Sequence, residues 1–146
     1  MDQRLIVTVP VVVYLGTLVL FAAARSIVGA PLTEGQPAFI AIVGVIGPLT
    51  ALGLIWLRNY TYGAPVLVSS MLTTVWFVTY FFFLHDNPAN AFAVAGEGAL
   101  AFLMATFSVV ATSLVTAGVA FWLWYRESPG FRSAIDGVVR PPETSD

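Results

Sequence analysis

Four long runs of apolar residues, separated by short polar segments, dominate the pattern along this chain. Each run reaches the roughly 20 residues that a helix needs to cross the hydrocarbon core of a bilayer. None of the runs contains Asp, Glu, Arg, Lys or His. Backbone groups in lipid must be satisfied within the segment, so such runs form helices. The pattern predicts an all-α integral membrane protein, a four-helix transmembrane bundle with spans at about 5–24, 38–57, 65–84 and 99–125.

Composition supports the membrane class and excludes several kinds of chemistry. Of the 146 residues, 58% are apolar and 10% are charged, against about 25% charged in an average soluble domain. The chain has no cysteine and no lysine, which excludes disulfides, thiolate metal sites and lysine Schiff bases. The net charge of −2 gives no indication of a nucleic-acid partner. We expect a membrane domain over 1–126 and a cytoplasmic tail over 127–146.

The arginines predict the orientation of the bundle. With four spans, both termini share one side of the membrane, and all but one of the arginines fall on that side. Basic residues accumulate on the cytoplasmic side, so both termini are expected to be cytoplasmic. The lack of lysine and the acidic tail suggest a prokaryotic chain in the cell membrane. The predicted cytoplasmic arginines are Arg4, Arg58, Arg126, Arg132 and Arg140, and Arg25 lies opposite.

The connections between the spans differ in length. Arg58–Ala64 is expected to be a short turn that joins spans two and three into a hairpin. The other two connections, 25–37 and 85–98, are longer and rich in Gly, Pro and Asn. The second one includes the apolar patch 91–95, which is too short to span a bilayer. This patch is expected either to lie at the membrane interface or to fold back over the bundle.

The tail contains one candidate helix, at 129–139. Ser128 followed by Pro129 is typical of an N-cap and a first helical position, and apolar residues then recur at helical spacing. The segment predicts an amphipathic helix on a lipid or partner surface, ended by prolines 141 and 142. A frayed tail is the equal alternative, because Gly130 and Gly137 weaken so short a helix.

A weak internal repeat relates the two halves of the chain. Glu34–Ile40 and Glu97–Leu103 share the pattern E-G-x-x-A-F followed by Ile or Leu, each just before an even-numbered span. The match suggests a 2+2 tandem repeat of helical hairpins, with coincidence as the competing explanation. In that arrangement Glu34 and Glu97 could approach each other and bind a cation. Stabilisation of the helix starts by the two carboxylates is the favoured interpretation.

His85 and Asp86 complete the candidates for a polar site on the outer face. His85 is the single histidine of the chain, and an imidazole can titrate near neutral pH. Adjacent residues on a helix do not face each other, so His85 and Asp86 form no ready-made pair. We therefore expect an interfacial polar residue rather than a metal or haem ligand, and no metal or cofactor is predicted.

Hydroxyl and aromatic residues also recur inside two of the spans. They suggest a polar path or pocket between spans three and four, or else close helix packing. Packing is the favoured interpretation, because no ionisable residue lies inside the spans and transport routes for charged solutes normally have one. The residues concerned are Ser69, Thr73, Trp76 and Tyr80 of span three, and Ser108 and Thr112 of span four.

No catalytic motif is recognisable, so an enzyme is not expected. The sequence favours a small, multi-pass, non-catalytic protein that acts as an accessory or oligomer-forming helix-bundle subunit of a membrane complex. Its expected partners are the lipid bilayer and either further copies or other membrane subunits. The alternative is a small transporter or channel for a neutral or weakly charged solute, suggested by the proline kink expected at Pro48. An enzyme that uses His85 at the outer surface is the weakest hypothesis.

Overall fold

The computed structural model describes residues 2–140, and the secondary structure within that range is helical, with no strand. Four helical segments are long and apolar enough to cross a bilayer. The predicted all-helical class and the number of membrane-length helices are therefore confirmed. In chain order the elements are α1 (Gln3–Val28), α2 (Gly35–Phe39), the π-helix η1 (Ile40–Ile46), α3 (Gly47–Trp56), α4 (Tyr60–Thr79), the π-helix η2 (Tyr80–Leu84), α5 (Ala99–Glu127) and α6 (Pro129–Val139).

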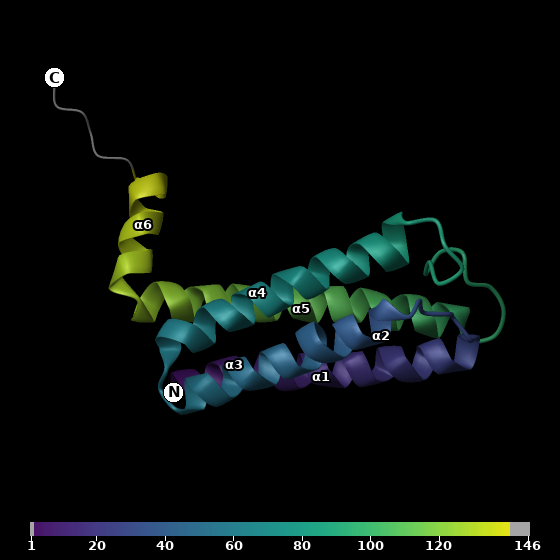
Figure 1. Cartoon of the computed structure of the whole chain (residues 1–146), viewed down its shortest axis with the longest axis horizontal. Coiled ribbons are helices and arrows are strands. Elements are labelled where there is room, and N and C mark those ends of the chain that lie inside the picture. Colours follow the sequence, from purple (N-terminus) through teal and green to yellow (C-terminus); the bar gives the residue numbers. More distant parts are fainter. Residues whose placement is uncertain (1, 141–146) are drawn as a thin grey trace, which may run out of the picture.

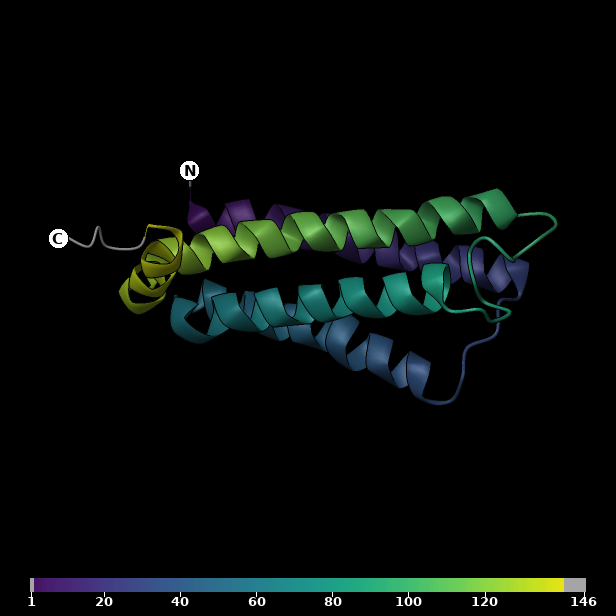
Figure 2. The same cartoon turned by 90° about the horizontal axis from the view of Figure 1, so that it is seen from above.

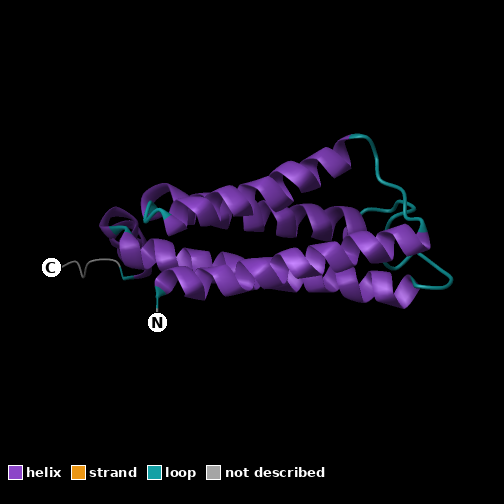
Figure 3. Ribbon diagram, turned by 90° about the horizontal axis from the view of Figure 1, so that it is seen from below, coloured by secondary structure: helices purple, strands orange, loops and turns teal. Residues whose placement is uncertain are grey.

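The long helices lie side by side, and α5 packs against both α1 and α4 (Figures 1 and 2). One end of the bundle, called the termini end, holds Gln3, the turn at 57–59 and Glu127. The opposite end, called the loop end, holds the connections 29–34 and 85–98. The segment formed by α2, η1 and α3 diverges from α1 toward the loop end (Figures 2 and 3), while Phe39 of α2 still stacks on Phe77 of α4. Helix α6 turns away from the direction of the bundle (Figure 1).

Each of the four membrane-length segments buries one face in the bundle and carries apolar residues on its exposed face as well. On α1 the buried stripe includes Val7, Val11, Tyr14 and Phe21, which recur at the spacing of one helix face. The outward face of the same helix carries residues such as Val19, which is 68% exposed. Apolar residues on both inner and outer faces are what a bundle surrounded by lipid requires, since lipid tails are as apolar as leucine.

The hairpin of α3 and α4 packs closely through two glycines. A Cβ on Gly63 would lie 2.8 Å from Cγ1 of Ile55, and one on Gly47 would collide with the Ser70 side chain. The turn between the helices, at 57–59, is shorter than the predicted connection 58–64. Asn59 caps α4 by accepting a hydrogen bond from the Tyr62 N–H at 3.3 Å, so the helix begins at residue 60 rather than near residue 65.

The kink expected at Pro48 takes the form of a change in helix type. The seven residues of η1 precede Gly47, whose N–H bonds to the carbonyl of Ile42, five residues earlier. Pro48 has no N–H to donate to the carbonyl of Gly44. The hydroxyl of the fully buried Tyr14 donates to that carbonyl at 2.7 Å. Helix α1 thus supplies a donor at the point where proline withholds one.

Candidate functional site

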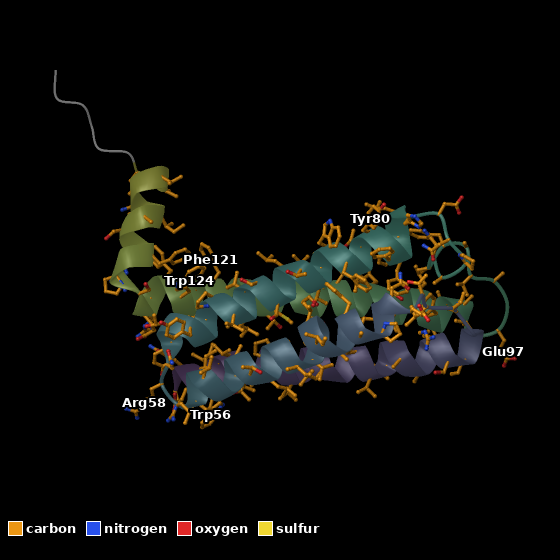
Figure 4. All side chains as sticks on the ribbon, viewed as in Figure 1. Trp56, Arg58, Tyr80, Glu97, Phe121 and Trp124 are labelled. Atoms are coloured by element: carbon orange, nitrogen blue, oxygen red, sulfur yellow. The ribbon has the colours of Figure 1, made fainter. Side chains whose placement is uncertain are left out.

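The residues of span three singled out for a polar face lie on the outer surface of α4 and η2. Trp76 is 60% exposed and Tyr80 is 40% exposed; Ser69 is also exposed and Thr73 is half-buried. The rings of Trp76 and Tyr80 stack with centroids 5.9 Å apart, and Tyr80 marks this side in Figure 4. We call these four residues the α4 face. They point away from the bundle, so they do not line a path between spans three and four.

The buried hydroxyls of span three belong to the neighbouring residues Ser70 and Thr74. Thr74 Oγ1 donates to the carbonyl of Ser70 at 2.8 Å, and its side chain lines a small void next to Tyr14 and Gly44. Sequence spacing marks both faces equally well, because each hydroxyl pair recurs at four residues. Only the packing distinguishes the buried pair from the exposed one.

The hydroxyls of span four turn toward α1. The Oγ1 atoms of Thr112 and Thr17 are 2.9 Å apart, and Thr116 Oγ1 donates to the carbonyl of Pro10 at 3.2 Å. The Ser108 hydroxyl bonds to the carbonyl of Met104 on its own helix at 2.8 Å. The contacts of Thr112 and Thr116 join α5 to α1, as small polar residues do at helix interfaces in membranes.

The α4 face has no hydrogen-bond partner within residues 2–140. None of its four side chains donates to or accepts from another described residue. Trp76 lies eight residues before the end of η2, about 12 Å along the helix, and so lies inside the apolar segment. Lipid offers nothing to an indole N–H there. Contact with another polar group would therefore give the side chains of this face hydrogen-bond partners that lipid does not offer.

The polar candidates at the loop end do not form one cluster. Glu34, His85, Asp86 and Glu97 are all exposed, and Glu97 lies at the extreme of this end in Figure 4. Within the described range 2–140, no three His, Asp or Glu residues gather where a metal ion could be held. His85 instead helps to line a hollow of about 290 Å³ whose other polar side chains are Thr33, Gln36 and Asn87.

Two asparagines that the sequence reasoning did not single out hold the second long connection. Asn90 is 8% exposed; its amide donates to the carbonyl of His85, and its side-chain oxygen accepts from the Phe92 N–H, both at 2.9 Å. Asn87 donates to the carbonyl of Phe81 at 2.7 Å. Such local bonds are the usual signature of asparagine in turns. Ala91, the first residue of the apolar patch 91–95, is buried, so the start of this patch folds back over the bundle.

The two glutamates stand before different helix starts. Glu34 precedes α2 without a side-chain capping bond. The capping contact there joins the Thr33 N–H to Oε1 of Gln36 at 3.0 Å, which is one half of a capping box. Glu97 precedes Gly98, whose φ of 83° starts α5 in the left-handed region. Attraction to the positive ends of the helix dipoles remains the role that this placement favours.

Arginine and aromatic side chains gather at the termini end. The Arg4 guanidinium lies 4.8 Å from the ring centroid of Trp56, whose indole N–H donates to Thr8 Oγ1 at 3.0 Å; Trp56 is labelled in Figure 4. The hydrogen bond from the Arg4 side chain lowers the pKa of Asp2 to about 2. Amphipathic rings beside arginines are typical of a membrane boundary.

Helix α6 is fixed to the same end. The Phe131 ring stacks on Trp124 with centroids 3.8 Å apart, and the Tyr125 hydroxyl donates to Oδ1 of Asp136 at 2.7 Å. The Ser128 hydroxyl accepts from the Phe131 N–H at 3.3 Å, which caps the helix start. The stop predicted at prolines 141 and 142 lies outside the described residues.

Comparisons of the chain with protein-family models, curated proteins and solved structures find no match. Three of the features described above could serve a function. They are the unpartnered α4 face, the polar hollow beside His85 and the arginine and aromatic boundary at the termini end. Of these, the α4 face is the one that lies inside an apolar segment.

Proposed function

We propose that the protein is a non-catalytic subunit of a membrane complex that associates through the α4 face with a second copy or with another membrane subunit. One observation carries the proposal. The Trp76 side chain is 60% exposed within a segment that is long and apolar enough to span a bilayer, and its N–H has no partner within residues 2–140. A neighbouring helix could satisfy that donor, whereas lipid could not.

The chemistry of the face suits helix association in a membrane. Ser69 and Thr73 offer hydroxyls one helical turn apart, and Trp76 and Tyr80 continue the same stripe with stacked rings. Hydrogen bonds between helices in membranes contribute about 0.6–2 kcal/mol each. Two or three such bonds across one interface would favour association by a few kcal/mol on that scale.

Measuring the oligomeric state of the purified full chain in several mild detergents and in lipid nanodiscs tests the proposal. We expect Trp76→Phe and Thr73→Val, separately and together, to weaken association with itself or with a co-purifying subunit. The matched control is Phe107→Leu, because Phe107 is 62% exposed on another helix. A monomer without a co-purifying partner under all conditions would contradict the proposal, as would equal effects of the control and the α4 substitutions.

We also propose that both termini are cytoplasmic in a prokaryotic cell membrane, because all arginines but Arg25 fall at the termini end or on the tail beyond it. Cysteines replacing Leu57 and Ala93 suit the test, since both positions are exposed at opposite ends of the bundle. A membrane-impermeant thiol reagent on intact cells should label only position 93. Labelling of position 57 alone would invert the proposed orientation. We propose the 2+2 repeat together with this topology. With both termini on one side of the membrane, each half is a helical hairpin of the same orientation, as a tandem repeat requires.

A small transporter for a neutral solute is the second candidate. The observation that favours it is the seven-residue π-helix in the middle of the second span, because π-helical turns and broken helices are frequent at functional sites. Reconstituted vesicles should then show protein-dependent flux of a neutral solute. The absence of flux across a panel of small polyols and amino acids would contradict the transporter proposal and favour the subunit proposal.

A further inference from the structure

A lateral groove separates α1 from the diverging second span near the loop end. Its volume is about 420 Å³, within the range of small-molecule sites in proteins. The groove is lined by one face of each segment, including Val19, Ala22 and Arg25 of α1 and Pro37, Ala41 and Val45 of α2 and η1. Figure 3 shows the divergence of the second span that opens it.

The groove opens toward the surface that faces lipid. Val19 is 68% exposed, and Ala22 and Ala41 are exposed as well, although all three line the groove. Its walls are apolar except at one end, where Arg25 stands. An acyl chain matches such a surface, because it is the apolar molecule that surrounds the bundle at high concentration.

Arg25 supplies a charge at the level of the lipid headgroups. It lies 21 residues after Arg4 on the same helix, about 32 Å at the rise of an α-helix, and a hydrocarbon core is about 30 Å thick. If Arg4 and its Trp56 contact mark one boundary, Arg25 marks the other. A long arginine side chain at a helix end reaches toward the interface.

The Arg25 side chain has no anionic partner among residues 2–140. Its Nε atom is buried and has no hydrogen-bond partner among them. The ion pairs within this range join Arg4 to Asp2 and Arg126 to Glu127, so neither includes Arg25. A planar guanidinium pairs with phosphate through two parallel hydrogen bonds.

We propose that this groove binds one phospholipid of net negative charge, with an acyl chain between α1 and η1 and the headgroup phosphate on Arg25. A zwitterionic lipid carries the same chain and phosphate but adds a cation near the arginine. Charge therefore selects the anionic lipid, and the groove selects its chain. The site is independent of the α4 face, which lies on another helix.

Native mass spectrometry of the delipidated full chain, titrated with phosphatidylglycerol or phosphatidylcholine, tests the site. The wild-type chain should bind one phosphatidylglycerol about tenfold more tightly than phosphatidylcholine, the scale of one charge-assisted hydrogen bond. Arg25→Gln should abolish the preference and Arg25→Lys should keep most of it. Arg58→Gln, an exposed arginine at the termini end, should leave it unchanged.

A second pair of variants tests the groove itself. Ala22→Phe fills the groove and should weaken the binding of both lipids, whereas Ala23→Phe adds the same ring at the adjacent exposed position outside it. Circular dichroism checks that each variant is folded. Equal affinity of the wild type for the two lipids would overturn the proposal. So would an unchanged preference in Arg25→Gln, or equal binding by the two phenylalanine variants.

Discussion

Replacing Gly63 with alanine is expected to loosen the hairpin of α3 and α4. The added Cβ would lie 2.8 Å from Cγ1 of Ile55 and 3.1 Å from both the Ala51 carbonyl oxygen and the Ile55 backbone nitrogen. The two backbone atoms cannot rotate away, so the helices must separate. Overpacking of this kind costs about 1–3 kcal/mol, and the better helix propensity of alanine returns about 1 kcal/mol. A net loss of up to about 2 kcal/mol follows.

Gly53→Ala is the matched control, because Gly53 lies in the same hairpin and its Cβ would meet no atom within 4 Å. This change is expected to be neutral or to stabilise by up to about 1 kcal/mol. Unfolding in mixed micelles, driven by a harsh detergent and followed by tryptophan fluorescence, gives both free energies. If Gly63→Ala proves as stable as Gly53→Ala, the close approach of α3 and α4 is refuted.

Three further changes test other parts of the molecule. Glu34→Gln and Glu97→Gln should each lower the unfolding free energy by about 0.3–1 kcal/mol, additively and whether or not divalent cations are present; cation-dependent coupling in a double-mutant cycle would reveal a paired site. Tyr125→Phe removes the hydrogen bond to α6 and should speed tryptic cleavage within α6 while the spans unfold as before; an unchanged cleavage rate would contradict the docking. Because Arg4 holds the pKa of Asp2 at about 2, below its ordinary 3.8, the bond should protect the first turn of α1 above about pH 4 and fail as the pH falls toward 2. Amide exchange at that turn measures this, and Asp2→Asn should remove the pH dependence.

The number of spans could be predicted because each rests on the summed hydropathy of about 20 residues. No single contact is needed for that sum. The ends of the spans were less predictable, since they depend on one bond each. The cap from Asn59 to the Tyr62 N–H moves the start of α4 well ahead of Pro65, the first residue of the predicted span.

The direction in which a face points could not be predicted from apolar spacing. In a soluble bundle a polar stripe faces water, so the alternation identifies the core. In a bundle surrounded by lipid both faces are apolar, and that information is lost. Ser69 and Thr73 therefore looked equivalent to Ser70 and Thr74, although the first pair lies outward and the second is buried. The lateral groove could not be predicted either, because it depends on how far the second span diverges from α1, which no pattern in the sequence records.

The change of helix type at Pro48 places a proline beside a tyrosine hydroxyl, and a double-mutant cycle can test whether the two are coupled. Pro48 withholds an N–H from the Gly44 carbonyl, and the buried Tyr14 hydroxyl supplies a donor at 2.7 Å. Tyr14→Phe should therefore cost about 1–3 kcal/mol, the price of leaving a buried acceptor unsatisfied. Pro48→Ala restores an N–H, so in that background the same change should cost clearly less. Tyr80→Phe serves as the control, because Tyr80 is exposed at the start of η2. This change should be close to neutral in both backgrounds. An equal cost of Tyr14→Phe with and without Pro48 would mean that Tyr14 acts through its packing, and that proline and tyrosine are not a coupled pair.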